Sequence, residues 1–254
     1  MIEIFPDPEQ LADAVARHVA ACAEAGIAAR GRFTVALSGG STPRAAYSRL
    51  AAPDTPPMRA GLLRIPTPAW RLIHIVWGDE RCVRPSDPRS NYRMAMEALL
   101  DRVPIPPDHI HRIKGEDDPE KAAAEYEREL RLLLTTGLDL VLLGLGEDGH
   151  TASLFPGQPA VRETDRWVVA VPGGSRSPDG LWRVTLTPGI LNRARNVTFV
   201  VSGATKAPTL QRVVEGPFHP DVLPAQAIHP DEGRLTWMVD EAAAGALRPH
   251  RAST

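Results

Sequence analysis

The sequence predicts an α/β fold, a single domain with a mainly parallel central sheet flanked by helices on both faces. Short apolar runs rich in β-branched residues alternate along the chain with longer segments of helical spacing, which is the pattern of a helix-covered parallel sheet. Most of these runs are apolar at almost every position, as in strands buried on both faces. Several of them end in a glycine-containing turn that leads into a helix. At 254 residues the chain fits one large domain of this kind.

The first half of the chain begins with a helix over residues 8–29. Asp7 and Pro8 mark its start, because aspartate suits the N-cap and proline suits the first turn. The elements that follow are a strand over 33–37, a helix over 44–50, a proline-rich loop over 51–69 with room for one helical turn, a strand over 72–77 and a helix over 91–100.

The second half continues the alternation of strands and helices. Asp118 caps a helix over residues 119–134, and a strand over 138–143 leads into a glycine-rich turn. Further strands are expected over 167–171, 182–186, 197–201 and 235–239, with helices near 188–194 and 204–215. We expect one domain over residues 1–254, in which the last few residues, about 248–254, form a disordered tail.

Composition favours a small-molecule role. Hydrophobic residues make up 43% of the chain, enough for a full core, and the formal net charge of -2 gives no general attraction to nucleic acid or to an anionic membrane. No apolar run reaches the roughly 18 residues of a membrane span. Cys22 and Cys82 build neither a disulfide framework nor a four-cysteine zinc site. We therefore expect a cytoplasmic protein, a monomer or a weak homodimer.

The turn after the first predicted strand is suited to an anion. It contains the hydroxyl residues Ser38, Ser41 and Thr42 around Gly39 and Gly40, and it precedes a helix whose free N–H groups favour negative charge. A phosphate would fit there, although the same residues also suit a plain tight turn with a helix cap. The turn is not a P-loop, because no Gly-Lys-Ser or Gly-Lys-Thr follows.

A charged turn, residues 78–81, follows the next predicted strand. Asp79 and Arg81 belong to it, and the planar guanidinium of Arg81 could hold an oxyanion or a carboxylate. Taken alone, these residues are better explained by a structural cluster of salt bridges.

His150 closes a third turn, GLGEDGH over residues 144–150. The turn formally matches the dinucleotide fingerprint G-x-G-x-x-G, but Pro156 and Gly157 cut any following helix to two turns, and Asp165 precedes a strand where the fingerprint needs an acid after one. We therefore reject a dinucleotide site. A histidine held in such a turn suits proton transfer near neutral pH.

Lys206 and a pair of histidines complete the set of candidate residues. Lys206 follows another strand end and could reach a phosphate in the same crevice, or it could be an ordinary solvated helix lysine. His109 and His111 could hold a metal, but a solvated loop is the simpler interpretation, and we predict no metal site.

Together these motifs resemble the 6-phosphogluconolactonase family, a branch of the fold shared with glucosamine-6-phosphate deaminases and ribose-5-phosphate isomerases, a modified Rossmann fold. The resemblance spans nearly the whole chain in order. Its motifs are LSGGSTP at 37–43, WGDERCV at 77–83, SNY at 90–92, GLGEDGHTASLFPG at 144–157, RVTLTP at 183–188, SGATKA at 202–207 and PAQAI at 224–228.

The resemblance implies hydrolysis of 6-phospho-D-glucono-1,5-lactone to 6-phospho-D-gluconate in the oxidative pentose phosphate pathway, without metal or organic cofactor. His150 would be the general base, Arg81 would hold the carbonyl oxygen, and Asp148 would orient the histidine or cap its turn. The substrate, and its phosphate in particular, would be bound by Ser38, Gly39, Gly40, Ser41, Thr42, Asp79, Arg183 and Lys206. The segment SPDGLWR at 177–183 departs from the family pattern, which has a Pro-Pro pair shortly before the arginine.

Two other functions are weighed against this one. Sugar-phosphate isomerases and deaminases of the same fold resemble D-G-H-I-A-F-N-E-P, and this chain has Phe155 where they have glutamate, so it lacks the carboxylate that would tune the histidine. A sugar-phosphate sensor would carry a helix-turn-helix segment, and nothing before Phe33 could form one.

Overall fold

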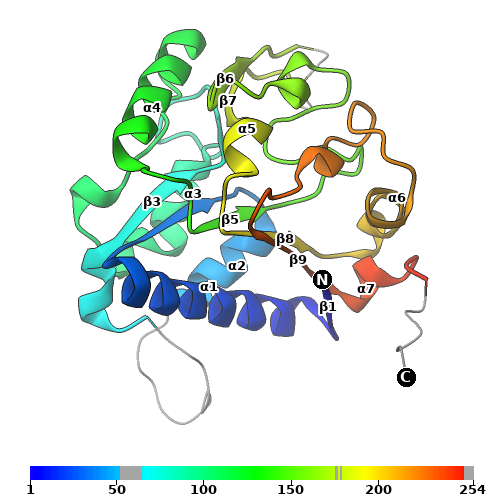
Figure 1. Ribbon diagram of the computed structural model, residues 1–254, viewed down its shortest axis with the longest axis horizontal. Helices are drawn as coiled ribbons and strands as arrows, with labels where there is room; N and C mark the ends of the chain where they lie inside the picture. The colour runs from blue at the N-terminus through cyan, green and yellow to red at the C-terminus, as the bar shows by residue number, and fades with distance from the viewer. Residues whose placement is uncertain (52–64, 175–176, 178, 249–254) are drawn as a thin grey trace.

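The computed structural model describes residues 1–51, 65–174, 177 and 179–248 (Figure 1). Most of the proline-rich loop, and residues 249–254 of the tail that we expected to be disordered, lie outside these residues. The predicted fold class is confirmed. A six-stranded parallel sheet forms the centre of the molecule, in the spatial order β1-β9-β8-β5-β2-β3. Its strands are β1 (Ile2–Phe5), β2 (Phe33–Leu37), β3 (Ile73–Trp77), β5 (Leu140–Leu143), β8 (Asn196–Val201) and β9 (Arg234–Asp240).

Helices cover both faces of the parallel sheet. Figure 1 shows α1 (Pro8–Arg30) and α2 (Ser41–Leu50) on one face, and α5 (Pro188–Leu191) and α6 (Ala207–Glu215) on the other. The remaining α-helices are α3 (Asn91–Ala98), α4 (Pro119–Leu133) and α7 (Glu241–Ala244). Short 3-10 helices lie at Thr67–Leu72, Leu100–Arg102, Pro107–His109, Pro159–Arg162, Ala204–Lys206 and Pro224–Ala227.

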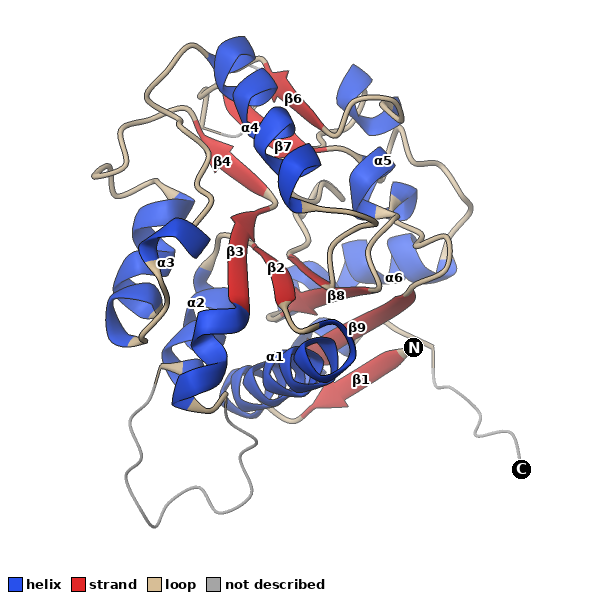
Figure 2. Ribbon diagram, turned by 60° about the vertical axis from the view of Figure 1, so that its left-hand side comes forward, coloured by secondary structure: helices blue, strands red, loops and turns tan. Residues whose placement is uncertain are grey.

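A second, antiparallel sheet stands beyond the end of β3 (Figure 2). It consists of β4 (Asp79–Arg81), β7 (Arg183–Leu186) and β6 (Val168–Val171), in that order. Two of our predicted strands belong to this sheet, and the segment over 79–81 that we predicted as a turn is its first strand. The prediction of a turn was wrong because a three-residue polar strand has no apolar pattern of its own and is defined only by its pairing with β7.

Gly78 joins the two sheets. Its N–H donates to the carbonyl of Leu37 at the end of β2, 2.9 Å away, and its own carbonyl accepts from the N–H of Leu186 in β7 at 2.8 Å. The chain therefore leaves the parallel sheet through one residue and enters the antiparallel sheet immediately. This junction places β4 above the carboxyl ends of β2 and β5.

The two predicted N-caps are confirmed, whereas α2 begins at Ser41, three residues earlier than predicted. Asp7 accepts from the backbone N–H of Gln10 at 2.8 Å, and Asp118 accepts from that of Lys121 at 3.0 Å, so both aspartates cap their helices as expected. Strand β1 was not predicted, because it is only four residues long and pairs along a single edge, where Glu3 is exposed. No helix follows His150; the chain there forms turns up to the 3-10 helix Pro159–Arg162.

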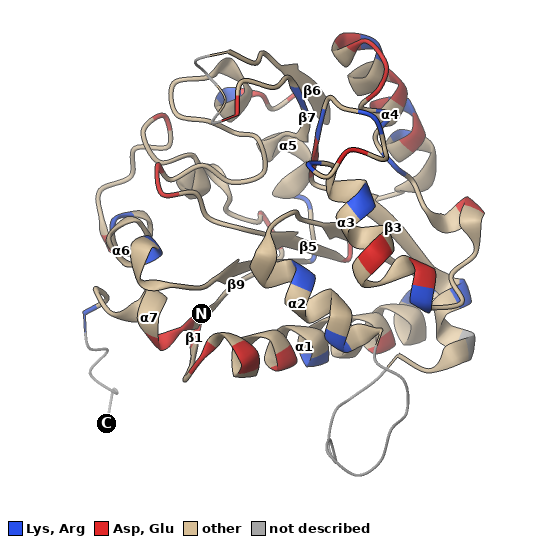
Figure 3. Ribbon diagram, turned by 180° about the vertical axis from the view of Figure 1, so that it is seen from behind, with Lys and Arg blue, Asp and Glu red and all other residues tan. Residues whose placement is uncertain are grey.

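The surface is mixed in charge. Acidic and basic residues are interspersed along helices α1 and α4 (Figure 3). Within the described part of the chain, no helix combines the length and apolarity needed to cross a bilayer.

Candidate active site

A cavity of about 290 Å³ opens at the carboxyl ends of β2, β5 and β8. Ligands bind at this edge in open parallel sheets. Nine of the residues predicted to act on the substrate line it together, from four separate segments: Ser38, Gly39, Gly40, Ser41, Thr42, Asp79, Arg81, His150 and Lys206. The order of the sheet explains the convergence, because β5 pairs directly with β2 and β8 pairs directly with β5.

The turn after β2 presents a helix N-terminus to the cavity. Gly40 is the N-cap of α2 and supplies no side-chain hydrogen bond, so the first backbone N–H groups of the helix have no side-chain cap. The Oγ of Ser38 is buried and has no hydrogen-bond partner among the described residues. Tyr47 fixes the turn from behind: its hydroxyl accepts from the N–H of Ser38 and donates to the carbonyl of Ser38, both at 3.0 Å. The turn therefore offers several unpaired donors to an anion.

The turn also depends on the absence of a side chain at Gly39. A Cβ atom at this position would lie 2.0 Å from the Oδ1 of Asn91, far inside van der Waals contact. Asn91, the first residue of α3, fills that space and itself lines the cavity. The glycine thus permits the close approach of α3 to the anion-binding turn.

Asp148 holds His150 in a defined orientation. Its Oδ1 lies 2.5 Å from the ring Nδ1 of His150 and accepts from the backbone N–H of the same residue at 3.1 Å. Burial by itself raises the pKa of Asp148, but the hydrogen bonds and the charge of His150 outweigh it and keep the pKa below its usual range. A carboxylate on Nδ1 favours the tautomer with the proton on that nitrogen, which leaves the lone pair on Nε2. No described group hydrogen bonds to Nε2.

Gly146 and Phe155 surround the imidazole ring. A Cβ at Gly146 would lie 2.1 Å from the Nδ1 of His150, so only glycine allows the ring to fold back over the turn. The ring of Phe155 packs against the other side, with centroids 4.9 Å apart and planes tilted by 57°. The histidine is therefore placed by packing as well as by its hydrogen bond.

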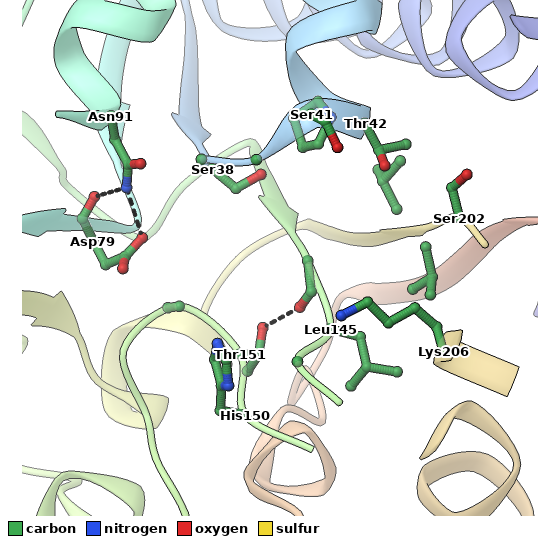
Figure 4. A pocket seen from close by; sticks show the side chains of 18 of the residues that line it. Ser38, Ser41, Thr42, Asp79, Asn91, Leu145, His150, Thr151, Ser202 and Lys206 are labelled. Atoms are coloured by element: carbon green, nitrogen blue, oxygen red, sulfur yellow. Dashed lines mark hydrogen bonds between the residues drawn. The ribbon is translucent and has the colours of Figure 1, made fainter. Parts of the chain in front are cut away.

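Polar side chains at the Asp79 end of the cavity form a buried network. Asp79 accepts from the Oγ of Ser153 at 2.6 Å and from the Nδ2 of Asn91 at 3.2 Å, and Figure 4 shows Asn91 and Asp79 lying across the cavity from Lys206. An ionised carboxylate has about four acceptor positions, so Asp79 keeps acceptor capacity for a ligand. Asn91 and Ser153 were not among our predicted site residues. They lie in the SNY and TASLFPG motifs, but their contacts with Asp79 appear only when the strands are paired.

Glu80, the residue between Asp79 and Arg81, points away from the cavity and has a structural role. Its buried carboxylate accepts from the backbone N–H groups of Asn91 and Tyr92, both at 2.8 Å, and from the Oγ of Ser90 at 2.9 Å. Burial raises the pKa of Glu80, against the lowering effect of these hydrogen bonds. The alternation of strand side chains thus gives neighbouring acids different functions, one in the cavity and one at the start of α3.

Two arginines lie opposite each other in the antiparallel sheet. Arg81 and Arg183 are direct partners in the pairing of β4 with β7. Arg81 lines the cavity and donates to the carbonyl of Arg89 at 2.6 Å, whereas Arg183 is not a lining residue and pairs with Asp179 at 2.7 Å. Burial lowers the pKa of Arg183, and the charges of Asp79 and Asp179 oppose this effect. Arg183 thus lies beside Arg81 on the neighbouring strand and does not line the cavity, where we expected it to contact the phosphate.

Lys206 reaches the cavity from the residue that precedes α6. Its side chain extends toward the centre of the cavity in Figure 4, and its Nζ lies 3.8 Å from a carboxylate oxygen of Glu147. The end of β8 is held by Asp240, which accepts from the hydroxyl of Ser202 at 2.5 Å and from the N–H of Gly203 at 3.0 Å. Hydrogen bonds to Asp240 therefore hold the backbone that precedes Lys206.

His109 and His111, which we considered as metal ligands, do not line the cavity. His111 contacts His74 of β3, with its Nε2 3.1 Å from the Nδ1 of His74. The described residues contain no group of three or more His, Cys, Asp or Glu side chains arranged to hold a metal ion.

Comparisons with known proteins identify one family. The family model described as glucosamine-6-phosphate isomerases/6-phosphogluconolactonase matches residues 6–237. A 6-phosphogluconolactonase of Synechocystis sp. is 42% identical over 230 residues, covering 88% of each chain. The structure of the 6-phosphogluconolactonase from Trypanosoma brucei superposes with a TM-score of 0.84 at 31% identity, covering 98% of each chain. A monomeric glucosamine-6-phosphate deaminase, 22% identical, shares the fold with a TM-score of 0.78 over 96% of this chain and 99% of its own.

The match to the family model covers most of the chain, and the Synechocystis relative matches it over nearly its full length. The chain belongs to the glucosamine-6-phosphate isomerase/6-phosphogluconolactonase family.

Proposed function

We propose that this chain is a 6-phosphogluconolactonase, which hydrolyses 6-phospho-D-glucono-1,5-lactone to 6-phospho-D-gluconate with His150 as general base. One observation carries the proposal: an imidazole held by a carboxylate on Nδ1 lines the same cavity as Lys206 and the uncapped N-terminus of α2. A base and an anion site on one small cavity suit a phosphorylated substrate that reacts with water.

The proton transfers follow from the tautomer of His150. The Nε2 lone pair accepts a proton from water while the water oxygen attacks the lactone carbonyl at C1. The imidazolium then gives that proton to the ring oxygen as the bond between C1 and this oxygen breaks. Asp148 stabilises the charged ring during the step. General base catalysis of this kind contributes about 10² to 10⁴ in rate.

Arg81 holds the carbonyl oxygen as it becomes negatively charged. Its Nε is buried and has no partner within the described structure, and a buried donor without a partner is costly unless a ligand pairs with it. Arg183, its direct partner on β7, adds positive charge beside it. A donor positioned before the reaction stabilises the tetrahedral oxyanion without reorganisation.

The remaining lining residues place the sugar. Lys206, Ser41, Thr42 and the N–H groups of α2 bind the 6-phosphate, and Asp79 accepts hydrogen bonds from sugar hydroxyls at the other end of the cavity. A carboxylate would repel the phosphate, so the phosphate lies away from Asp79. This orientation places C1 near His150. The proposed steps use water and side chains only, and we place the reaction in the cytoplasm.

Deamination or isomerisation of an amino-sugar phosphate is the alternative activity within the family. It would need a carboxylate in place of Phe155, whose apolar ring instead packs against His150 with centroids 4.9 Å apart.

A non-catalytic sensor is the second alternative. It would explain the anion site but would give no function to the pair of Asp148 and His150.

The experiment is a lactonase assay in which the lactone is generated from glucose 6-phosphate by a dehydrogenase. Wild-type protein should remove the lactone much faster than it hydrolyses spontaneously, with and without chelator, and should release no ammonia from glucosamine 6-phosphate. In His150→Ala the catalysed rate should fall by at least about 10². A wild-type rate equal to the spontaneous rate would contradict the proposal and would favour the sensor.

A further inference from the structure

Lys206 is paired with an acid that lies outside the cavity wall. The Nζ of Lys206 is 3.8 Å from the Oε1 of Glu147, and the relative exposures of the two side chains are 27% and 64%. Glu147 does not line the cavity, but its neighbour Gly146 does. The carboxylate thus stands at the mouth of the cavity beside the lysine that we propose to bind phosphate.

Glu147 is held at this position by its backbone. Its carbonyl oxygen accepts from the Oγ1 of Thr209 in α6 at 2.6 Å, and α6 begins directly after Lys206. The next residue along the chain is Asp148, which is fixed to His150. The loop and the helix therefore hold the backbones of Glu147 and Lys206 next to each other.

The charges around the cavity show what this carboxylate does to an anion. Arg81 and Lys206 are the cations among the lining residues, and Asp79 is an anion among them. A phosphate monoester carries about -1.5 to -2 charges at pH 7. Glu147 repels this charge and also competes with it for Lys206. It therefore opposes the binding of any phosphate at the site.

We propose that Glu147 limits phosphate affinity, so that the enzyme releases its phosphorylated product readily. This inference rests on the function proposed above, because it needs the phosphate to bind at Lys206. The product keeps the phosphate of the substrate and gains a carboxylate, so it is more negatively charged than the substrate. A carboxylate at the mouth of the cavity therefore raises KM somewhat and disfavours the product more.

Glu147→Gln tests the proposal, because it removes the charge and keeps the shape. Glu232→Gln is the matched control. Glu232 is also exposed, but it lies just before the amino-terminal end of β9, whereas the cavity lies at the carboxyl ends of the strands. We would measure lactonase KM and kcat, and the inhibition constants of inorganic phosphate and of 6-phosphogluconate, at low and high ionic strength. Lys206→Met reports separately whether phosphate binds at this lysine.

At low salt, Glu147→Gln should lower KM and both inhibition constants about two- to fivefold, the range available to an exposed charge pair. The inhibition constant of 6-phosphogluconate, the more negatively charged ligand, should fall more than KM. High salt should shrink this difference, because the Debye length falls to about 3 Å at 1 M. Glu232→Gln should resemble the wild type at both ionic strengths.

Two outcomes contradict the inference in different ways. If phosphate inhibits the wild type and Lys206→Met weakens that inhibition, but Glu147→Gln leaves the constants unchanged, then Glu147 has no such function while the phosphate site stands. If phosphate does not inhibit the wild type, or Lys206→Met leaves inhibition unchanged, then the phosphate site is misplaced and the inference fails with it.

Discussion

At the scale of single residues, the turn of residues 144–150 makes room for the histidine that we propose as the base. Gly146 leaves the space that the imidazole of His150 occupies, and a Cβ there would lie 2.1 Å from its Nδ1. Asp148 then fixes the rotation of the ring through its 2.5 Å contact with that nitrogen. The sequence predicted the histidine and left open whether Asp148 orients it or caps its turn; the two contacts of Oδ1 serve both functions.

Asp148→Asn should therefore reduce kcat by more than about tenfold with little change in KM. An amide can donate to Nδ1 and so stabilise the wrong tautomer, which is the reason the equivalent change is harmful in hydrolytic triads. Lactonase kinetics measure the effect, and Asp165→Asn, an exposed acid outside the cavity, is the control. An unchanged kcat in Asp148→Asn would show that Asp148 only caps the turn.

At the scale of elements, β4 is the segment that our sequence analysis described least well. Its three residues serve two purposes: Asp79 and Arg81 line the cavity, and Glu80 binds the N-terminus of α3. Strand alternation explains this division once the strand is known. The sequence did not reveal the strand, because its pairing partner β7 lies about a hundred residues away along the chain.

Strand β3 carries a histidine whose neighbours make the fold sensitive to acid. The ring of His74 stacks on that of His109 at 3.9 Å and contacts His111. Burial, then His109, His111 and Arg32, lower the pKa of His74 from 6.5 to about 4, and Asp108 opposes them. In the unfolded chain the pKa is higher, so the unfolded state binds more protons between these two values. His74 therefore favours folding fully above about pH 6.5, and this contribution is lost as the pH falls toward 4.

His74→Gln should weaken the dependence of unfolding free energy on pH between about pH 4 and 6.5, because the group that takes up the proton on unfolding is gone. Urea unfolding at a series of pH values measures this slope. His229→Gln, a change at an exposed histidine, should leave it as in the wild type. Equal slopes in wild type and His74→Gln would show that another group dominates acid sensitivity.

At the scale of the whole molecule, the cavity lies where the two sheets meet. The parallel sheet supplies the turns after β2, β5 and β8, and the antiparallel sheet supplies Asp79 and Arg81. A ligand in the cavity contacts both sheets and binds only the folded protein. Its binding energy should therefore stabilise the whole molecule.

6-Phosphogluconate at about 100 times its Kd should stabilise the fold by about 2.7 kcal/mol. For a chain of this size that corresponds to a rise in Tm of roughly 5 to 10 °C. Thermal unfolding with and without the ligand measures the shift, and gluconate, which lacks the phosphate, is the control at the same concentration. An equal shift with gluconate would contradict a phosphate-binding cavity.

The sequence by itself determined the fold class, most helices and strands, and nine of the residues that line the cavity. It could do so because these features are local: a buried parallel strand is a continuous apolar run, and an anion-binding turn needs glycine and hydroxyl residues before a helix. Every parallel strand delivers its following turn to the same edge of the sheet. The strand order that makes the turns after β2, β5 and β8 neighbours came from the structure.

Only the tertiary structure decided which residues become neighbours across long stretches of chain. It assigned β4, β6 and β7 to a second sheet and brought Asn91 and Ser153 to Asp79. It also placed Arg183 opposite Arg81 and set Glu147 beside Lys206. Each of these contacts depends on strand register and on packing between elements far apart in sequence. No local pattern of residues contains that information, because the same apolar run can pair in either sheet.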